Sequence, residues 1–148
     1  MRKRYTHLPL WALLLAWAFC SCTKVFPDDG LDYLWRLDRV EYKSGQDYYG
    51  NTCVKEYKTD VWYGFARNVV EVRHSAIHGP IGVFTNTGDS LCLDFSIYPD
   101  SIFRTDSLIS ILNECGMKRL TNKYLIEKID REDMILSDRE VRLSFTRW

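Results

Sequence analysis

The side chains of this chain that could do chemistry are few, and they are spread along the sequence. His74 and His78 are four residues apart, which on a helix would place two imidazoles on one face, as in metal sites. Their segment has the composition of a loop, and Glu71 is the one acidic residue close to them in sequence, so an ordinary surface pair is favoured over a metal site. Cys115 follows Glu114, with nothing nearby to activate its thiol.

Nucleophilic catalysis would need a base and an orienting group beside the nucleophile. No serine lies in a Gly-x-Ser-x-Gly segment, and two of the three histidines remain once residues 1–21 are set aside. Carboxylates are plentiful, but none is singled out by its spacing. We therefore predict no catalytic residue, no metal and no cofactor, and keep a hydrolase as a distant alternative.

The N-terminus indicates where the protein works. A cationic head at residues 2–4 is followed by an apolar run from Leu8 to Phe19 and by Ser21 just before Cys22. These are the parts of a secretory signal peptide, and the run is too short to cross a bilayer, which takes roughly 20 residues. The ending resembles a bacterial lipobox, which implies that residues 1–21 are removed and that Cys22 is lipidated, with palmitate as an expected acyl group.

Two alternatives to this lipid anchor stay open. Cys20 is a rival acceptor, although Phe19 before it is not small, and an ordinary cleaved signal is the other. Residues 22–32 have the composition of an acylated tether, and their acidic pair Asp28-Asp29 resembles export signals of some bacterial surface lipoproteins. The expected location is the bacterial cell envelope, lipid-anchored to the outer membrane, either in the periplasm or exposed on the surface.

Charge and composition exclude further classes. The chain has 20 Lys and Arg and 20 Asp and Glu, and residues 1–21 hold three of the cations and none of the anions, so residues 22–148 carry a net charge of about −3. This net negative charge excludes strong nucleic-acid binding. It also argues against tight electrostatic binding to an anionic bilayer, so the lipid is the expected membrane attachment. The hydrophobic content of 46%, with 14% aromatics, suits one folded domain, predicted over residues 33–148.

The cysteines leave their pairing undecided. Cys53, Cys92 and Cys115 are an odd number in a compartment that permits disulfide bonds, so one expectation is a single bridge and one remaining thiol. The other expectation is that all three are small buried apolar residues. No two of them have the spacing of a zinc site.

From Tyr33 onward the pattern is that of short strands. Trp35 and Leu37 are in one phase and Val40 and Tyr42 in the other, which predicts a bulge between them or a short turn before the strand. Strands are expected over 54–65, 68–74, 81–85 and 90–98, and a β-meander is expected from Tyr124 to the end. About eight strands with short turns are typical of an antiparallel sandwich or an up-and-down barrel.

One helix interrupts this pattern near residues 106–115. Asp106 or Ser107 can cap it, and Gly116 can end it. Its apolar residues fall at helical spacing, so this face is expected to dock on the sheet or to close a cavity; they are Leu108, Ile111, Leu112 and Cys115.

The first and last phrases of the domain resemble a known family. Trp35-Arg-Leu37 with Val40-Glu-Tyr42, and the closing phrases at 124–130, 134–138 and 141–147, are similar to bacterial lipocalin-like lipoproteins. The resemblance implies a mainly β, calycin-type up-and-down barrel, with Arg147 packing over Trp35. Tyr33 stands where true lipocalins have a glycine two residues before the tryptophan.

The many aromatic residues allow two interpretations of function. They either fill the barrel or line a cavity for a small apolar or amphipathic ligand, because eight strands leave room for side chains or for one small ligand. Trp62 is out of phase with Tyr63 and Phe65, so it could mark an exposed binding surface. Non-catalytic ligand binding is the leading hypothesis, and an envelope protein–protein interaction module with a filled core is the alternative. The residues predicted to line a ligand cavity are Trp35, Tyr63, Phe65, Phe84, Leu93 and Phe95.

Overall fold

The computed structural model describes residues 30–48, 50, 52–56, 60–74, 79–96 and 105–148, with no side-chain detail for 52–56 and 105. The predicted signal peptide, Cys22 and most of the predicted tether lie outside the described residues. So do His78 and the last residues of the predicted strand 90–98. Within the described part, no helix is both long enough and apolar enough to span a membrane.

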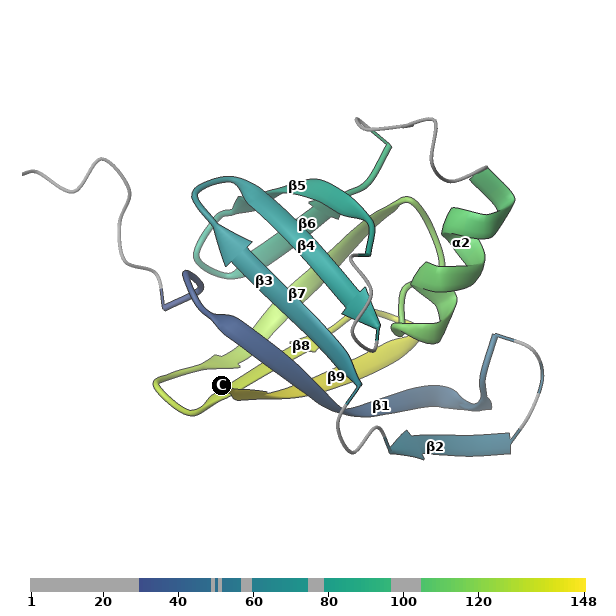
Figure 1. The fold of residues 1–148 in the computed structure, drawn as a ribbon. Coiled ribbons are helices and arrows are strands. Elements are labelled where there is room, and N and C mark those ends of the chain that lie inside the picture. The colour runs from purple at the N-terminus through teal and green to yellow at the C-terminus, as the bar shows by residue number, and fades with distance from the viewer. Residues whose placement is uncertain (1–29, 49, 51, 57–59, 75–78, 97–104) are drawn as a thin grey trace, which may run out of the picture.

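The described strands form one antiparallel sheet that closes into a barrel of eight strands (Figure 1). The predicted fold class, a mainly β up-and-down barrel with one helix, is therefore confirmed. The order round the barrel is β1-β3-β4-β5-β6-β7-β8-β9, and β1 closes the ring by pairing with β9. The strands are β1 (Leu34–Gln46), β2 (Thr52–Glu56), β3 (Val61–Ala66), β4 (Val69–His74), β5 (Ile81–Asn86), β6 (Ser90–Asp94), β7 (Thr121–Ile129), β8 (Asp133–Ser137) and β9 (Val141–Arg147).

Strand β1 has a bulge at the predicted place. Its register with β9 shifts between Leu37 and Arg39, so Asp38 is the extra residue. Trp35 and Leu37 before the shift and Val40 and Tyr42 after it are all buried, because the extra residue restores the inward phase. The Asp38 carboxylate accepts hydrogen bonds from Arg36 Nε, at 2.8 Å, and from the Thr146 hydroxyl. The second half of β1 continues past β3 and pairs with the extra strand β2.

Side chains of alternate residues fill the barrel in the described part of the chain. Buried residues alternate with less buried ones along β3, β4, β6, β8 and β9, except at the last residues of β4, β8 and β9, as their sequence patterns predict. The largest side chains with less than 2% of their surface exposed include Trp35, Tyr63, Phe95 and Tyr124. Burial of this set is the main stabilising contribution to the fold.

Helix α2 (Thr105–Glu114) lies across one end of the barrel, which we call the α2 end (Figure 1). Leu108, Leu112 and Cys115 are buried and Ile111 is half-buried, so the expected apolar face docks as predicted. Gly116 ends the helix in a left-handed conformation with φ +83°. The Tyr63 hydroxyl, from inside the barrel, donates a 2.6 Å hydrogen bond to the carbonyl of Cys115 and so ties the helix to β3.

The opposite end, where the chain enters at Gly30, is called the entry end. Trp35 Nε1 donates to the carbonyl of Leu31 at 3.2 Å, which fixes the entering segment. Arg147 stands opposite Trp35 in the β1–β9 register, but its guanidinium lies 3.1 Å from the centre of the Tyr33 ring. The expected packing of arginine over tryptophan is thus replaced by packing over Tyr33, because that position holds a ring instead of a glycine.

Candidate functional site

The candidate site is built around the turn between β8 and β9, at the α2 end. The Asp138 carboxylate accepts hydrogen bonds from the backbone N–H groups of Glu140, at 2.6 Å, and Val141, at 2.7 Å. An aspartate that binds its own backbone in this way stabilises a tight turn. The turn holds Arg139 at its tip, where the side chain is exposed.

Three pockets meet at Arg139, which lines all of them. Their volumes are about 550, 620 and 480 Å³, in the usual range for small-molecule sites. The first lies between the turn and the end of β1, the second lies between the turn, the β5–β6 turn and β7, and the third lies beside the segment that joins α2 to β7. Their cationic lining residues, besides Arg139, are Lys43, Lys118, Arg119 and Lys123.

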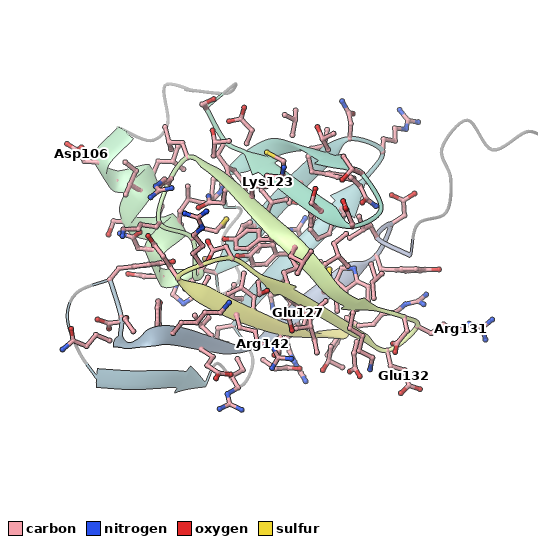
Figure 2. All side chains as sticks on the ribbon, turned by 180° about the vertical axis from the view of Figure 1, so that it is seen from behind. Asp106, Lys123, Glu127, Arg131, Glu132 and Arg142 are labelled. Atoms are coloured by element: carbon pink, nitrogen blue, oxygen red, sulfur yellow. The ribbon has the colours of Figure 1, made fainter. Side chains whose placement is uncertain are left out.

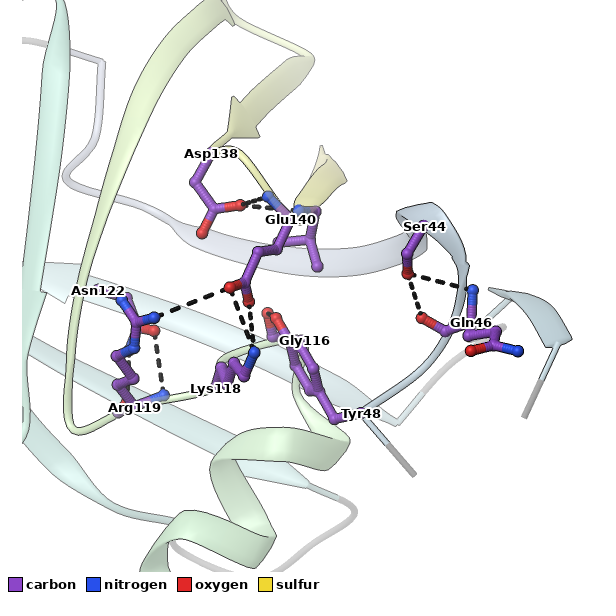
Figure 3. A network of polar contacts seen from close by, with 10 residues as sticks. Ser44, Gln46, Tyr48, Gly116, Lys118, Arg119, Asn122, Asp138 and Glu140 are labelled. Atoms are coloured by element: carbon purple, nitrogen blue, oxygen red, sulfur yellow. Dashed lines mark hydrogen bonds and ion pairs between the residues drawn. The ribbon is translucent and has the colours of Figure 1, made fainter. Parts of the chain in front are cut away.

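Two tyrosines give the first pocket an aromatic wall. The rings of Tyr42 and Tyr48 meet edge to face, with centroids 5.0 Å apart. The Tyr48 hydroxyl donates to the carbonyl of Gly116 at 3.4 Å, which links this wall to the end of α2 (Figure 3). Burial raises the pKa of Tyr48, and Tyr42 and Asp138 add to the rise. The phenol therefore stays protonated and neutral at physiological pH.

The cations around the turn differ in how they are paired. Glu140 accepts an ion pair from Lys118 at 3.1 Å and a longer one from Arg119 at 3.8 Å (Figure 3). Lys43 donates to the backbone carbonyl of Asp138. Among the described residues, Arg139 has no carboxylate partner within ion-pair distance. Lys123, which lines the second and third pockets, has no such partner among these residues either, but Arg139 is the cation that borders all three pockets, and it is therefore the better placed for an anionic group.

Tyr124 contributes a buried polar group near the same place. Only 1% of its surface is exposed, and its hydroxyl makes no hydrogen bond to any described residue. Burial raises the pKa of this phenol, and Tyr48 and Asp138 raise it further. The group is a neutral hydroxyl whose desolvation is not offset by a hydrogen bond to any described residue.

The six residues predicted to line a ligand cavity belong to the barrel interior. Trp35, Tyr63, Phe65, Leu93 and Phe95 are buried, and Phe84 is half-buried with its ring 5.2 Å from that of Phe65. The structure brings them together in one core cluster with Phe84 packed against it, and none of them lines the three pockets around Arg139. Their role as ligand contacts stays a prediction.

The sequence pattern predicted a β-meander from Tyr124 onward and assigned no role to Arg139. A signal was present, because the triplet Asp-Arg-Glu occurs twice, at 130–132 and at 138–140. Asp130 accepts from the backbone N–H groups of Glu132 and Asp133, each at 2.8 Å, as Asp138 does in its own turn. The two turns therefore have the same backbone hydrogen-bonding pattern around their arginines. Arg131 lies at one end of the barrel and Arg139 at the other.

The other residues singled out for chemistry lie elsewhere. His74 Nδ1 is 3.3 Å from a carboxylate oxygen of Glu114, so it joins the end of β4 to α2. Cys92 is half-buried and Cys115 is buried, and no disulfide bond joins them. No cluster of three or more His, Cys, Asp or Glu that could hold a metal ion occurs in the described part of the chain.

An eight-stranded up-and-down barrel with a helix across one end defines the class of lipocalin-type barrels. The comparisons agree: the chain matches the lipocalin-like domain family over residues 17–148 and belongs to that family. No curated protein matches it.

Two solved structures have the same fold. An uncharacterized protein from Bacteroides eggerthii superposes with a TM-score of 0.62 at 12% identity, over 80% of this chain and 99% of that one. A lipocalin-like protein from Bacteroides uniformis gives 0.59 at 11% identity, over 80% and 99%. At these identities the likeness concerns the fold.

Proposed function

We propose that this protein is a lipid-anchored, non-catalytic binding protein of the bacterial cell envelope, and that it takes a small amphipathic ligand with an anionic group at the α2 end. The observation that carries the binding proposal is the position of Arg139, exposed and bordering three pockets beside the Tyr42–Tyr48 wall. The lipocalin-like fold supports a ligand-binding domain of this general kind.

The geometry favours the rim over the barrel interior as the place of binding. The described interior is filled by buried side chains, whereas the first pocket offers about 550 Å³ bordered by two rings, three cations and the carboxylates of Asp47 and Glu140. A ligand with an apolar part on Tyr42 and Tyr48 and an anionic group at Arg139 would use both features. Charge-assisted hydrogen bonds to such a group contribute more than neutral ones.

The cellular part of the proposal rests on the N-terminus. The signal-like run and Ser21 before Cys22 support removal of residues 1–21 and acylation of Cys22. The net charge of residues 22–148, about −3, leaves the acyl chains as the attachment to the outer membrane.

Titration calorimetry with laurate, a probe with one apolar chain and one carboxylate, tests the ligand class. The protein would be residues 22–148 with Cys22→Ser, which removes the acyl chains and with them the need for detergent. We expect laurate to bind and Arg139→Gln to weaken its binding at least about tenfold, the effect of losing one charge-assisted bond. Arg131→Gln is the matched control, since it removes the same residue from the twin turn, and it should leave the affinity unchanged.

Two results would contradict this site. Equal weakening by Arg131→Gln and Arg139→Gln would show a general effect of charge, and tighter binding of 1-dodecanol than of laurate would show that no anion is recognised.

The filled interior favours one second candidate, an envelope protein–protein interaction module. Binding of neither probe, together with specific capture of a partner that Arg139→Gln does not affect, would support it.

A further inference from the structure

An apolar patch lies on the outer wall of the barrel, where β1, β3 and the end of β9 meet. The rings of Trp62 and Trp148 meet edge to face, with centroids 4.8 Å apart. Trp148 also donates its backbone N–H to the carbonyl of Leu34, and it is 75% exposed. We call Leu34, Trp62 and Trp148 the tryptophan patch. No described large apolar side chain is more exposed than Trp148.

Arginines flank this patch in the sheet. Trp62 stands opposite Arg36 on β1 and opposite Arg73 on β4, and directly opposed residues point to the same face. Each arginine is paired with a carboxylate, Arg36 with Asp38 at 2.8 Å and Arg73 with Glu71 at 2.6 Å. The surroundings of the two rings are therefore charged but close to neutral overall.

The chain that leads to Cys22 begins next to this patch. Leu34 is four residues after Gly30, so the two are at most about 14 Å apart. Gly30 is eight positions after Cys22, a stretch of chain that reaches at most about 28 Å when fully extended. A domain of this size is roughly 35 Å across. A lipid on Cys22 would thus keep the entry end, and the patch beside it, close to the bilayer surface.

We propose that the tryptophan patch rests in the interfacial region of a zwitterionic bilayer, an inference that depends on the lipid anchor proposed above. Tryptophan rings favour this region, where an apolar body and a polar N–H are both accommodated. Paired arginines at the rim can extend to the lipid headgroups. Because the patch has little net charge, the contact should not depend on ionic strength.

Tryptophan fluorescence reports this contact directly. Residues 22–148 contain three tryptophans, of which Trp35 is fully buried and the other two form the patch. The lipidated protein would be placed in phosphatidylcholine vesicles with or without bromine on the acyl chains. The emission of the patch is the difference between the wild type and the Trp62→Phe, Trp148→Phe double variant. We expect brominated lipid to quench most of this difference, equally at low and high salt.

Two controls separate docking from tethering. Strand β7 is four strands from β3 in either direction round the barrel, so Leu125→Trp in the double variant places a reporter on the opposite wall. Leu125 is 55% exposed, and a tryptophan there should not be quenched. Insertion of a Gly-Ser linker of about 20 residues before Gly30 removes the short tether, and quenching of the patch should persist.

The outcomes distinguish the anchor from the contact. If the protein sediments with the vesicles but its tryptophans are not quenched, the contact is overturned and the anchor stands. The same conclusion follows if quenching disappears when the long linker is inserted. Patch tryptophans covered by residues before Gly30 or by a protein partner would give that first result. Protein that stays in the supernatant would refute the anchor and the contact together.

Discussion

At the scale of single residues, two buried tyrosines in one barrel have opposite hydrogen-bonding states. The Tyr63 hydroxyl donates to Cys115, whereas the Tyr124 hydroxyl has no partner among the described residues. A buried polar group without a partner costs about 1–3 kcal/mol. Tyr124→Phe should therefore raise the free energy of unfolding by about 1 kcal/mol, measured by urea denaturation.

Tyr63→Phe serves as the control for this prediction. It removes a made hydrogen bond and leaves the Cys115 carbonyl without that donor, so it should lower the free energy of unfolding by about 1 kcal/mol. The two substitutions delete the same atom from the same residue type. Loss of stability in both variants would show that Tyr124 has an acceptor, such as an ordered water, and would refute the assignment.

At the scale of elements, Gly116 determines how α2 joins the barrel. Its φ is +83°, and a Cβ there would be 2.7 Å from Leu143 Cδ2 and 3.2 Å from Val40 Cγ2. Both neighbours are fully buried, so they have little room to move. Gly116→Ala should lower the free energy of unfolding by more than about 2 kcal/mol, as strain and overlap add.

Gly88, in the turn between β5 and β6, separates these two contributions. Its φ is +91°, but a Cβ there would have no atom within 4 Å. Gly88→Ala should therefore cost only about 1 kcal/mol, the cost of the left-handed backbone. Equal effects of the two substitutions in thermal or urea unfolding would show that packing at Gly116 contributes nothing.

The turn between β7 and β8 gives the domain a defined acid sensitivity. Hydrogen bonds from the backbone of Asp133 and Glu132, with a further one from Lys128, lower the pKa of Asp130 to about 2. Because the pKa is lower in the folded state, its stabilisation is present above about pH 4 and is lost as the pH falls toward 2. Asp130→Asn should flatten the dependence of the melting temperature on pH in that window and change it little near pH 7. An unchanged slope would contradict this role of Asp130.

The elements show which features a sequence can predict. Helix α2, the meander and the bulge at Asp38 follow from local periodicity, since a change of phase from Leu37 to Val40 has to be absorbed within the strand. The strand β2 was expected only as a segment near Val54, because its pairing with the far half of β1 depends on a register with no local signal. The pockets at Arg139 depend on three segments that are distant in sequence, the end of β1, the chain after α2 and the β8–β9 turn. The residue spacing within any one of these segments therefore could not predict that the three lie together.

At the scale of the whole molecule, the barrel has two chemically different ends. The α2 end carries the Arg139 pockets, and the entry end carries Tyr33 under Arg147 and the chain that leads to Cys22. On the sides of the barrel charged residues point outward, such as Lys123, Glu127 and Arg142 (Figure 2). Glu127 and Arg142 pair with each other at 2.7 Å, an exposed contact that contributes at most about 1 kcal/mol. A short tether at one end and a binding rim at the other would suit a domain held at a surface.

The proposed lipid anchor on Cys22 can be tested by substitution. Cys22→Ser should move the protein from the membrane fraction to the soluble fraction and abolish labelling by palmitate, because the acyl chains on Cys22 are the proposed attachment to the membrane. Cys20→Ser is the matched control, since it removes the rival acceptor two residues earlier and should leave both fractionation and labelling unchanged. The opposite pattern would place the lipid on Cys20. Membrane association that survives both substitutions, without label, would show that another part of the protein holds it there.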